Sequence, residues 1–145
     1  MKKILIFVDW FDPGYKGGGP IRSIAGFVDN FKECFELDIV TRDRDLDSKR
    51  AYENIETNIW CNHSKNVRLL YLSPERHLNK LIKIINNSEY DWIYFNSFFS
   101  FKYSILPNLI FKFLKNNKAN VLLAPRGEFN PERLNIKPLR KKTFI

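Results

Sequence analysis

The chain has 145 residues, of which 44% are hydrophobic and 15% aromatic. This length and apolar content suit one folded domain with a real core and exclude wholesale disorder. The formal net charge of +8 favours anionic partners such as phosphorylated molecules or acidic lipid surfaces, although a basic balance also simply keeps a small protein soluble. The sequence contains no zinc-finger, RNP or helix-turn-helix pattern, so we do not expect nucleic acid as a partner.

Cysteines and histidines are too few to predict a disulfide framework or a metal centre. Cys34 and Cys61 are the cysteines, and His63 and His77 are the histidines. Cys61 and His63 form the nearest approach to a ligand pair, but two further zinc ligands are lacking, so we expect no metal. The apolar run at residues 4–8 is too short for a signal peptide, and no stretch approaches the roughly 20 apolar residues of a membrane span. We therefore expect a cytoplasmic protein.

The first elements form a strand, loop, helix and strand in sequence. Residues 4–8 are a continuous apolar run typical of a strand that is buried on both faces. A loop rich in helix breakers follows and ends in the glycines at 17–19, and Pro20 suits the first turn of the next helix. Apolar residues at helical spacing continue over 21–31, and residues 37–41 form a second buried strand. The pattern predicts a right-handed βαβ unit.

Residues 42–66 have a different character from the rest of the chain. They begin with a run of charges of mixed sign that has no period. We interpret them as an exposed excursion within the domain, ending in a short strand near 57–60.

The remaining sequence alternates strands with helices. Strands are predicted at 67–72, 91–95 and 121–124, and helices at 73–85, 103–114 and 134–144, with Pro107 tolerated only in a first helical turn. Residues 125–128 form a tight turn after the last strand. Residues 1–145 are therefore expected to form a single α/β domain, Rossmann-like, with a mostly parallel sheet and helices on both faces.

Three loops leave the carboxyl ends of the predicted parallel strands, at residues 9–19, 96–100 and 125–129. Ligands of such sheets bind outside the carboxyl ends of the strands. We therefore expect the three loops to meet at one rim of the sheet.

The glycine loop fits neither the dinucleotide pattern G-x-G-x-x-G nor a Walker loop. Gly17, Gly18 and Gly19 would let the backbone approach a ligand closely, and the helix N-terminus behind them favours an anion. The alternative is a flexible turn that binds nothing. Arg22, on the first turn of that helix, is either a phosphate clamp or a surface arginine.

The other two loops carry hydrogen-bonding and charged side chains. Asn96 and Ser97 suit sugar hydroxyls, and Arg126 either faces the cleft or caps a neighbouring segment. Glu128 either pairs with Arg126 or serves as a base or as a carboxylate that binds a hydroxyl. The phenylalanines within 98–101 form a sugar-stacking or lipid-contacting cluster or, as is more usual for such side chains, belong to the core.

Three segments together resemble a known family. They are Lys16-Gly17-Gly18-Gly19-Pro20-Ile21-Arg22-Ser23, Tyr94-Phe95-Asn96-Ser97-Phe98-Phe99-Ser100 and Ala124-Pro125-Arg126-Gly127-Glu128-Phe129. In this combination the chain resembles the N-terminal half of GT-B glycosyltransferases of family 4, and most closely the bacterial branch that builds surface polysaccharides. The likeness runs over nearly the whole chain.

The resemblance implies one lobe of a GT-B fold and a metal-independent, retaining transfer of a sugar to an acceptor hydroxyl. The nucleotide-sugar donor is then a substrate, no cofactor is expected, and the acceptor is a glycan or a lipid-linked sugar. Carried over to this sequence, the donor diphosphate side comprises Gly17, Gly18 and Gly19, and the acceptor side comprises Asn96, Ser97, Arg126 and Glu128. Arg22, from its place on the first turn of the helix, is assigned to the donor side as well. Glu128 is the candidate for a catalytic role.

One departure from the family concerns a catalytic histidine. Many family 4 enzymes have a histidine after the strand that ends here at Phe95, whereas this chain has Asn96 and Ser97. The role of that histidine therefore does not carry over. Neither His63 nor His77 is expected to replace it.

The nucleotide-binding second lobe of a GT-B enzyme lies outside these 145 residues. We therefore expect the chain to be an acceptor-binding half with little or no transferase activity alone, completed by a C-terminal lobe in cis or by a second subunit. Its basic tail is either a docking surface for anionic lipid at the inner face of the membrane or a solvated helix face. The tail comprises Lys137, Arg140, Lys141 and Lys142.

A second hypothesis is that the chain is not an enzyme part but a stand-alone Rossmann-like module that binds a phosphorylated ligand or a partner protein. A third, a fragment of a nucleotide-binding oxidoreductase, is disfavoured. The pattern G-x-G-x-x-G is absent, and Thr41 and Arg42 stand where an acidic residue would end the second strand.

Overall fold

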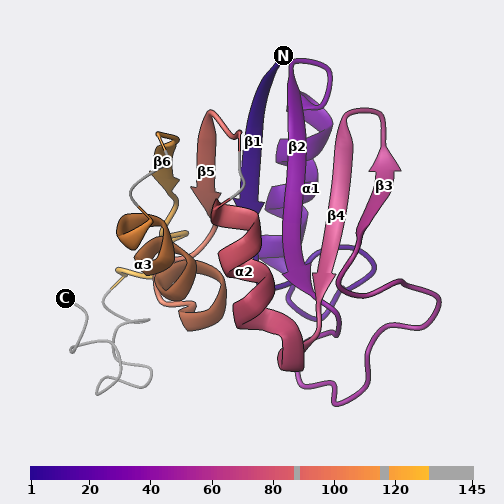
Figure 1. Ribbon diagram of the computed structural model, residues 1–145. Coiled ribbons are helices and arrows are strands. Elements are labelled where there is room, and N and C mark those ends of the chain that lie inside the picture. Colours follow the sequence, from indigo (N-terminus) through magenta and orange to yellow (C-terminus); the bar gives the residue numbers. More distant parts are fainter. Residues whose placement is uncertain (87–88, 115–117, 131–145) are drawn as a thin grey trace.

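A six-stranded sheet forms the centre of the computed structural model, which describes residues 1–86, 89–114 and 118–130 (Figure 1). The strands lie in the order β3-β4-β2-β1-β5-β6. All neighbouring pairs are parallel except the edge pair of β3 and β4. The strand bounds are β1 Lys2–Phe7, β2 Phe35–Arg42, β3 Trp60–Ser64, β4 Val67–Leu72, β5 Trp92–Phe95 and β6 Asn120–Leu123. The predicted α/β class with a mostly parallel, Rossmann-like sheet is confirmed.

Helices cover both faces of this sheet. α1 (Gly19–Phe31) lies on one face, and α2 (His77–Asn86) and α3 (Leu106–Phe113) lie on the other (Figure 1). Pro20 occupies the first turn of α1, as predicted. Before α3 the chain makes a π-helical turn at Phe101–Ile105, so the predicted helix at 103–114 is divided. Pro107 explains the division, because a residue without an N–H is tolerated only in the first turn of an α-helix.

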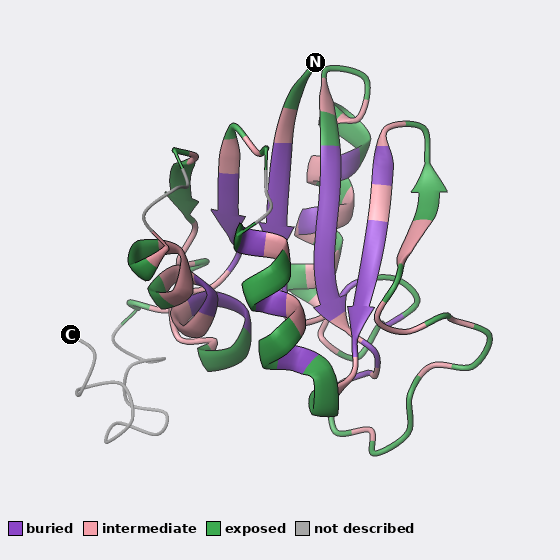
Figure 2. Ribbon diagram, in the orientation of Figure 1, coloured by how far each residue is buried: buried purple, intermediate pink, exposed green. Residues whose placement is uncertain are grey.

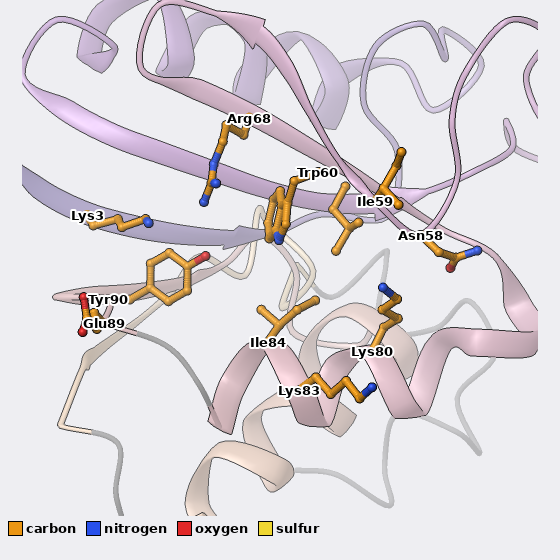
Figure 3. A pocket seen from close by; sticks show the side chains of 11 residues that line it. Lys3, Asn58, Ile59, Trp60, Arg68, Lys80, Lys83, Ile84, Glu89 and Tyr90 are labelled. Atoms are coloured by element: carbon orange, nitrogen blue, oxygen red, sulfur yellow. The ribbon is translucent and has the colours of Figure 1, made fainter.

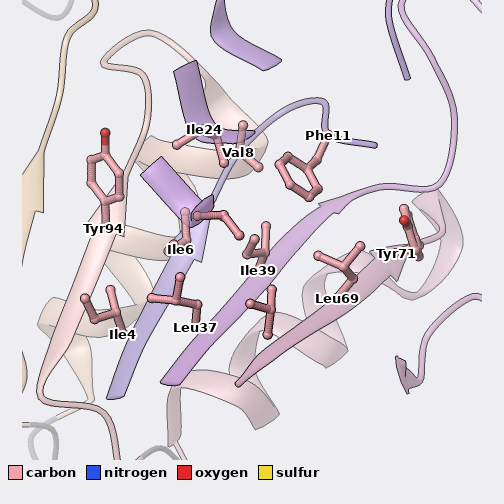
Figure 4. Packing of buried hydrophobic residues seen from close by; sticks show 12 residues of the cluster. Ile4, Ile6, Val8, Phe11, Ile24, Leu37, Ile39, Leu69, Tyr71 and Tyr94 are labelled. Carbon is pink, nitrogen blue, oxygen red and sulfur yellow. The ribbon is translucent and has the colours of Figure 1, made fainter. Parts of the chain in front are cut away.

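The central strands are buried on both faces, as their continuous apolar sequence predicts. In β1, Leu5, Ile6 and Phe7 are each 0% exposed (Figure 2). Side chains alternate between the faces. Ile4, Ile6 and Val8 pack towards α1 in one cluster (Figure 4), and Leu5 and Phe7 pack towards α2 and α3 in another. Helices therefore cover both faces of the sheet. This packing fixes the positions of the carboxyl ends of β1 and β5.

The connection from β2 to β4 differs from its sequence prediction. The strand expected near 57–60 is instead β3, from Trp60 to Ser64, and Thr57 makes only an isolated bridge with Tyr71. Asn66, with a φ of 60°, turns the chain directly back from β3 into β4, which fixes an antiparallel register and moves the strand along the sequence.

The excursion at 42–66 is mostly exposed or half-buried, but its first carboxylates are not. Asp43 is 2% and Asp45 9% exposed. Tyr52 and Ile55, from the same segment, pack against the α1-side cluster. The segment therefore covers part of the sheet on the face of α1, and hydrophobic periodicity alone does not reveal this role.

At the opposite edge, the four residues of β6 are all exposed (Figure 2). None of the helices that the structure describes has the length and apolar character that a membrane crossing requires. The predicted helix at 134–144 and the basic tail of Lys137, Arg140, Lys141 and Lys142 lie outside the described residues.

Candidate functional site

A cavity of about 540 Å³ opens where the carboxyl ends of β1 and β5 lie side by side. At this position the connections leave the sheet in opposite directions, which is where open α/β sheets bind ligands. The loops after β1, β5 and β6 all contribute to its wall, so they meet at one rim as the sequence predicts. We call this cavity the rim pocket; its lining residues include Asp9, Trp10, Pro20, Arg42, Asn96, Ser97, Phe99, Phe101, Lys102, Arg126 and Glu128.

Asn96 is held in a fixed orientation at the base of the rim pocket. It follows β5 directly and is 4% exposed. Its Oδ1 accepts a hydrogen bond from Arg126 Nε at 2.6 Å and another from the Tyr94 hydroxyl at 3.2 Å. A second guanidinium nitrogen of Arg126 donates to that hydroxyl. Arg126 can reach both groups because its turn places it at a φ of 50°, in the left-handed region. With Oδ1 occupied as an acceptor, Asn96 presents its amide nitrogen as a donor.

Two buried donors of the rim pocket have no hydrogen-bond partner among the described residues. They are Asn96 Nδ2 and Trp10 Nε1. Native proteins satisfy the large majority of their buried polar groups, and an exception calls for a specific cause such as a bound ligand or water. Both donors belong to residues that line the same cavity. The rim pocket therefore offers donors for a ligand with hydrogen-bond acceptors, such as the oxygens of a sugar or a phosphate.

Glu128 does not pair with Arg126, although the sequence leaves that option open. Its Oε1 accepts a hydrogen bond from the Ser97 hydroxyl at 2.8 Å, and its Oε2 accepts one from the backbone N–H of Phe98. The carboxylate thus ties the turn after β6 to the loop after β5. Each oxygen keeps a further lone pair, so Glu128 remains able to accept a hydrogen bond from a hydroxyl in the pocket.

Asp9 and Arg42 form an ion pair on the opposite wall. The Arg42 guanidinium donates through Nε at 3.2 Å and through Nη2 to the same Asp9 oxygen. It also lies over the rings of Trp10 and Tyr103, at 4.8 and 5.2 Å from their centroids. Such cation–π contacts stabilise a guanidinium in one position. Arg42 therefore presents a fixed positive charge, which its carboxylate partner neutralises in part.

The charges that line the rim pocket favour an anion. Arg42, Lys102 and Arg126 provide three cationic groups, while Asp9 and Glu128 provide two carboxylates. Since Asp9 is engaged by Arg42, the charge offered to a ligand comes mainly from Lys102 and Arg126. A phosphate group attached to a hydroxyl-rich molecule matches this mixture of cations and neutral donors.

The glycine loop lies next to the rim pocket, but its glycines and Arg22 are not among the lining residues, whereas Pro20 is. Gly18 has a φ of 65° and precedes α1 without any side-chain cap. A Cβ added at Gly18 or Gly19 would meet no atom within 4 Å. The backbone of this turn is therefore open to a ligand, and the donor-side role of Gly17, Gly18, Gly19 and Arg22 stays a prediction.

The loop before these glycines is fixed by the buried Asp45. Its carboxylate accepts hydrogen bonds from the backbone N–H groups of Tyr15, Lys16 and Leu46 at 3.1, 3.3 and 2.8 Å. Burial by itself would raise the pKa of Asp45, but these donors outweigh it and the pKa is lowered. Gly14 lets Tyr52 approach, because a Cβ there would lie 2.3 Å from the Tyr52 hydroxyl. The excursion thereby positions the glycine loop.

The phenylalanines after Ser97 are not core residues, so the more usual alternative for such side chains is wrong here. Phe98 and Phe99 are half-buried, and Phe101 is 57% exposed. Phe129 joins them from the turn after β6, with ring centroids 4.9 Å from Phe98 and 5.9 Å from Phe99. Loops from two strands meet at the rim, so these rings gather near the surface, where Phe99 and Phe101 line the rim pocket.

The histidines do not line the rim pocket. His77 is buried at the start of α2 and packs edge-on against Tyr103 at 5.1 Å. Burial lowers the pKa of His77 to about 4, and the charges of Lys102 and Arg42 act in the same direction. Within residues 1–86, 89–114 and 118–130, no group of three or more histidine, cysteine, aspartate or glutamate side chains could hold a metal ion.

Comparisons of the chain with models of known protein families, with curated proteins and with solved structures found no match. A functional conclusion therefore depends on the chemistry of the rim pocket.

The sequence predicts that Asn96, Ser97, Arg126 and Glu128 lie close together, and the structure places all four in the rim pocket. It did not single out Asp9, Trp10, Arg42 or Lys102. The first three directly follow or end the two central strands, so the rule about carboxyl ends could have identified them. Lys102 is placed by the π-helical turn, which no sequence pattern announces.

Proposed function

We propose that the chain is the acceptor-binding half of a retaining glycosyltransferase, and that the rim pocket receives a phosphate-bearing, lipid-linked sugar. A nucleotide-binding lobe, in cis or on a second subunit, would supply the donor. The proposal rests on the buried Nδ2 of Asn96, which has no hydrogen-bond partner among the described residues. Arg126 and Tyr94 both donate to the Oδ1 of the same side chain. A sugar hydroxyl or phosphate oxygen satisfies the Nδ2 donor.

The parts of such an acceptor match separate parts of the wall. Its phosphate is complemented by Arg126 and Lys102, and its lipid portion by Phe99 and Phe101. Glu128 accepts a hydrogen bond from the acceptor hydroxyl, because Asp9, the other lining carboxylate, is engaged by Arg42. In this arrangement the chain orients the acceptor, and transfer occurs only when the donor lobe is present.

Binding can be tested with the chain alone by following its tryptophan indole N–H signals by NMR. The chain contains Trp10, Trp60 and Trp92. Of these, only Trp10 lines the rim pocket. The probe is citronellyl diphosphate carrying N-acetylglucosamine, compared with citronellyl diphosphate, N-acetylglucosamine 1-phosphate and N-acetylglucosamine. We expect the full probe to shift the Trp10 signal at the lowest concentration.

Arg126→Ala should weaken binding of the full probe about tenfold, because it removes a charged hydrogen-bond donor and releases Asn96. Arg76→Ala, an exposed arginine outside the pocket lining, is the matched control and should bind like the unaltered chain. An unmoved Trp10 signal with all four probes, or equal binding by the Arg126 variant, contradicts the proposal.

The second candidate function is a stand-alone module that binds a phosphorylated ligand. Lys102 and Arg126, the lining cations that Asp9 does not neutralise, favour it, since they need no sugar to complement a phosphate. The same titration separates the two functions. If citronellyl diphosphate or the sugar phosphate binds as tightly as the full probe, the phosphate alone is recognised and the module is favoured.

A further inference from the structure

A second cavity, of about 530 Å³, lies between α2 and the part of the sheet formed by β3 and β4 (Figure 3). Its lining comes from the starts of β1 and β4, the segment before β5, β3 and one side of α2. It shares no lining residue with the rim pocket. We call this cavity the α2 cleft. Its lining includes cationic and aromatic side chains, namely Lys3, Trp60, Arg68, Lys80, Lys83 and Tyr90.

One buried carboxylate organises the wall of the α2 cleft. Asp38, on the central strand β2, is 2% exposed. It accepts hydrogen bonds from Arg68 Nε at 2.8 Å and Nη2 at 2.6 Å, and from the Tyr90 hydroxyl at 2.6 Å, and Lys3 Nζ lies 3.6 Å away. Burial would raise the pKa of Asp38, but these partners outweigh it and the pKa is lowered. Asp38 thus fixes groups from three separate segments around the cleft.

Aromatic rings form two sides of the cleft (Figure 3). The guanidinium of Arg68 lies 5.1 Å from the centroid of the Trp60 ring. The ammonium of Lys3 lies 5.2 Å from the centroid of the Tyr90 ring. Because Asp38 also fixes Arg68 and Tyr90, both rings have defined positions. One face of each ring is covered by its cation, and both rings line the cavity, where a planar ring such as a base can contact them.

The charge of the cleft is positive. Lys3, Arg68, Lys80 and Lys83 line it, while among the described residues Glu89 alone lines it with a carboxylate. The Asp38 charge is shared by Arg68 and Lys3, so the lysines of α2 are not neutralised by it. Neither the Lys80 nor the Lys83 side chain makes a hydrogen bond or an ion pair with any residue that the structure describes. They lie three residues apart on one side of a helix, a spacing at which both can contact one anionic group.

We propose that the α2 cleft is a second ligand site, which binds a mononucleotide with its base against Trp60 and Tyr90 and its phosphate at Lys80 and Lys83. The cavity falls within the roughly 300–1,000 Å³ of small-molecule sites. A mononucleotide has a planar base, which the aromatic side chains can contact, and a phosphate, which the lysines can bind. This site is separate from the rim pocket and does not depend on its function.

The test is an NMR titration of the chain with adenosine 5′-monophosphate and uridine 5′-monophosphate, following the tryptophan indole signals. Trp60 reports on the α2 cleft, Trp10 reports on the rim pocket, and Trp92 lines neither. We expect the Trp60 signal to move and the other two to stay. Adenosine and inorganic phosphate, tested separately, should bind at least about tenfold more weakly than the nucleotide, since each contacts only part of the wall.

The double variant Lys80→Gln/Lys83→Gln should weaken nucleotide binding about tenfold or more without altering the fold, because both side chains are at the surface of α2. Lys49→Gln/Lys112→Gln removes the same charge from exposed positions outside both cavities and should leave binding unchanged. An unmoved Trp60 signal at about 10 mM nucleotide, equal weakening in both double variants, or a shift of Trp10 alone overturns the proposal.

Discussion

The rim pocket and the α2 cleft have similar volumes and both carry cations, yet their buried polar groups are arranged differently. In the rim pocket, Asn96 and Trp10 keep donors without a partner among the described residues. Beneath the α2 cleft, the buried carboxylate of Asp38 accepts hydrogen bonds from two lining residues, Arg68 and Tyr90. Buried donors without a partner lower the stability of the fold but leave hydrogen-bonding capacity for a ligand, whereas a satisfied network stabilises the fold. The two cavities therefore differ in how a buried polar group serves the site: Asn96 keeps a donor for a ligand, whereas Asp38 is fully engaged and holds the groups around it in place.

The largest expected effect concerns His77, which lies buried against Tyr103 on the rim side. Its pKa is about 4 in the folded chain and 6.5 when exposed. The unfolded state therefore binds a proton first, and the folded chain loses about 3 kcal/mol as the pH falls from roughly 6.5 to 4. Urea unfolding between pH 7.5 and 4 measures this loss.

His77→Phe should remove most of that pH dependence, and His63→Phe, at an exposed position on β3, should retain it. A His77 variant with the same pH profile as the unaltered chain contradicts this account.

The next effect tests the network of the α2 cleft. Asp38→Ala should lower the free energy of unfolding by about 2 kcal/mol, because the Tyr90 hydroxyl loses its acceptor and Arg68 its partner. Glu36→Ala, an exposed neighbour on the same strand, should change it by less than about 0.5 kcal/mol. Since the pKa of Asp38 is lowered, its contribution is present above about pH 4 and is lost at lower pH. Equal stability of the two variants would contradict the stabilising role of the Asp38 network.

A smaller effect separates the glycines of the loop. Gly14→Ala should destabilise the chain by about 1–2 kcal/mol, because its Cβ would lie 2.3 Å from the Tyr52 hydroxyl and 2.9 Å from the Phe11 carbonyl. Gly19→Ala, with open space around it, should change stability by about 0.5 kcal/mol or less. Thermal unfolding of both variants measures the difference, and a more sensitive Gly19 would contradict the assigned role of the Asp45 and Tyr52 contacts.

The sequence predicts the fold better than the site. Continuous apolar runs identify the strands and helical spacing the helices, because burial on a sheet imposes these patterns directly. The rule about carboxyl ends also predicts which loops converge. It does not predict that Arg126 holds Asn96 or that Asp45 holds the loop before the glycines, since one or two hydrogen bonds join segments about 30 residues apart in each case. The α2 cleft has no sequence pattern at all, because its wall combines the ends of several strands.

The central claim is that Asn96 offers its Nδ2 to an acceptor in the rim pocket, and Asn96→Asp tests it most directly. The change keeps the oxygen that Arg126 and Tyr94 contact but replaces the donor by a second acceptor. The chain should keep its stability within about 1 kcal/mol, while binding of the diphosphate-linked sugar probe, followed by the Trp10 indole signal, should weaken at least about tenfold. Unchanged binding by a folded Asn96→Asp variant would contradict the account.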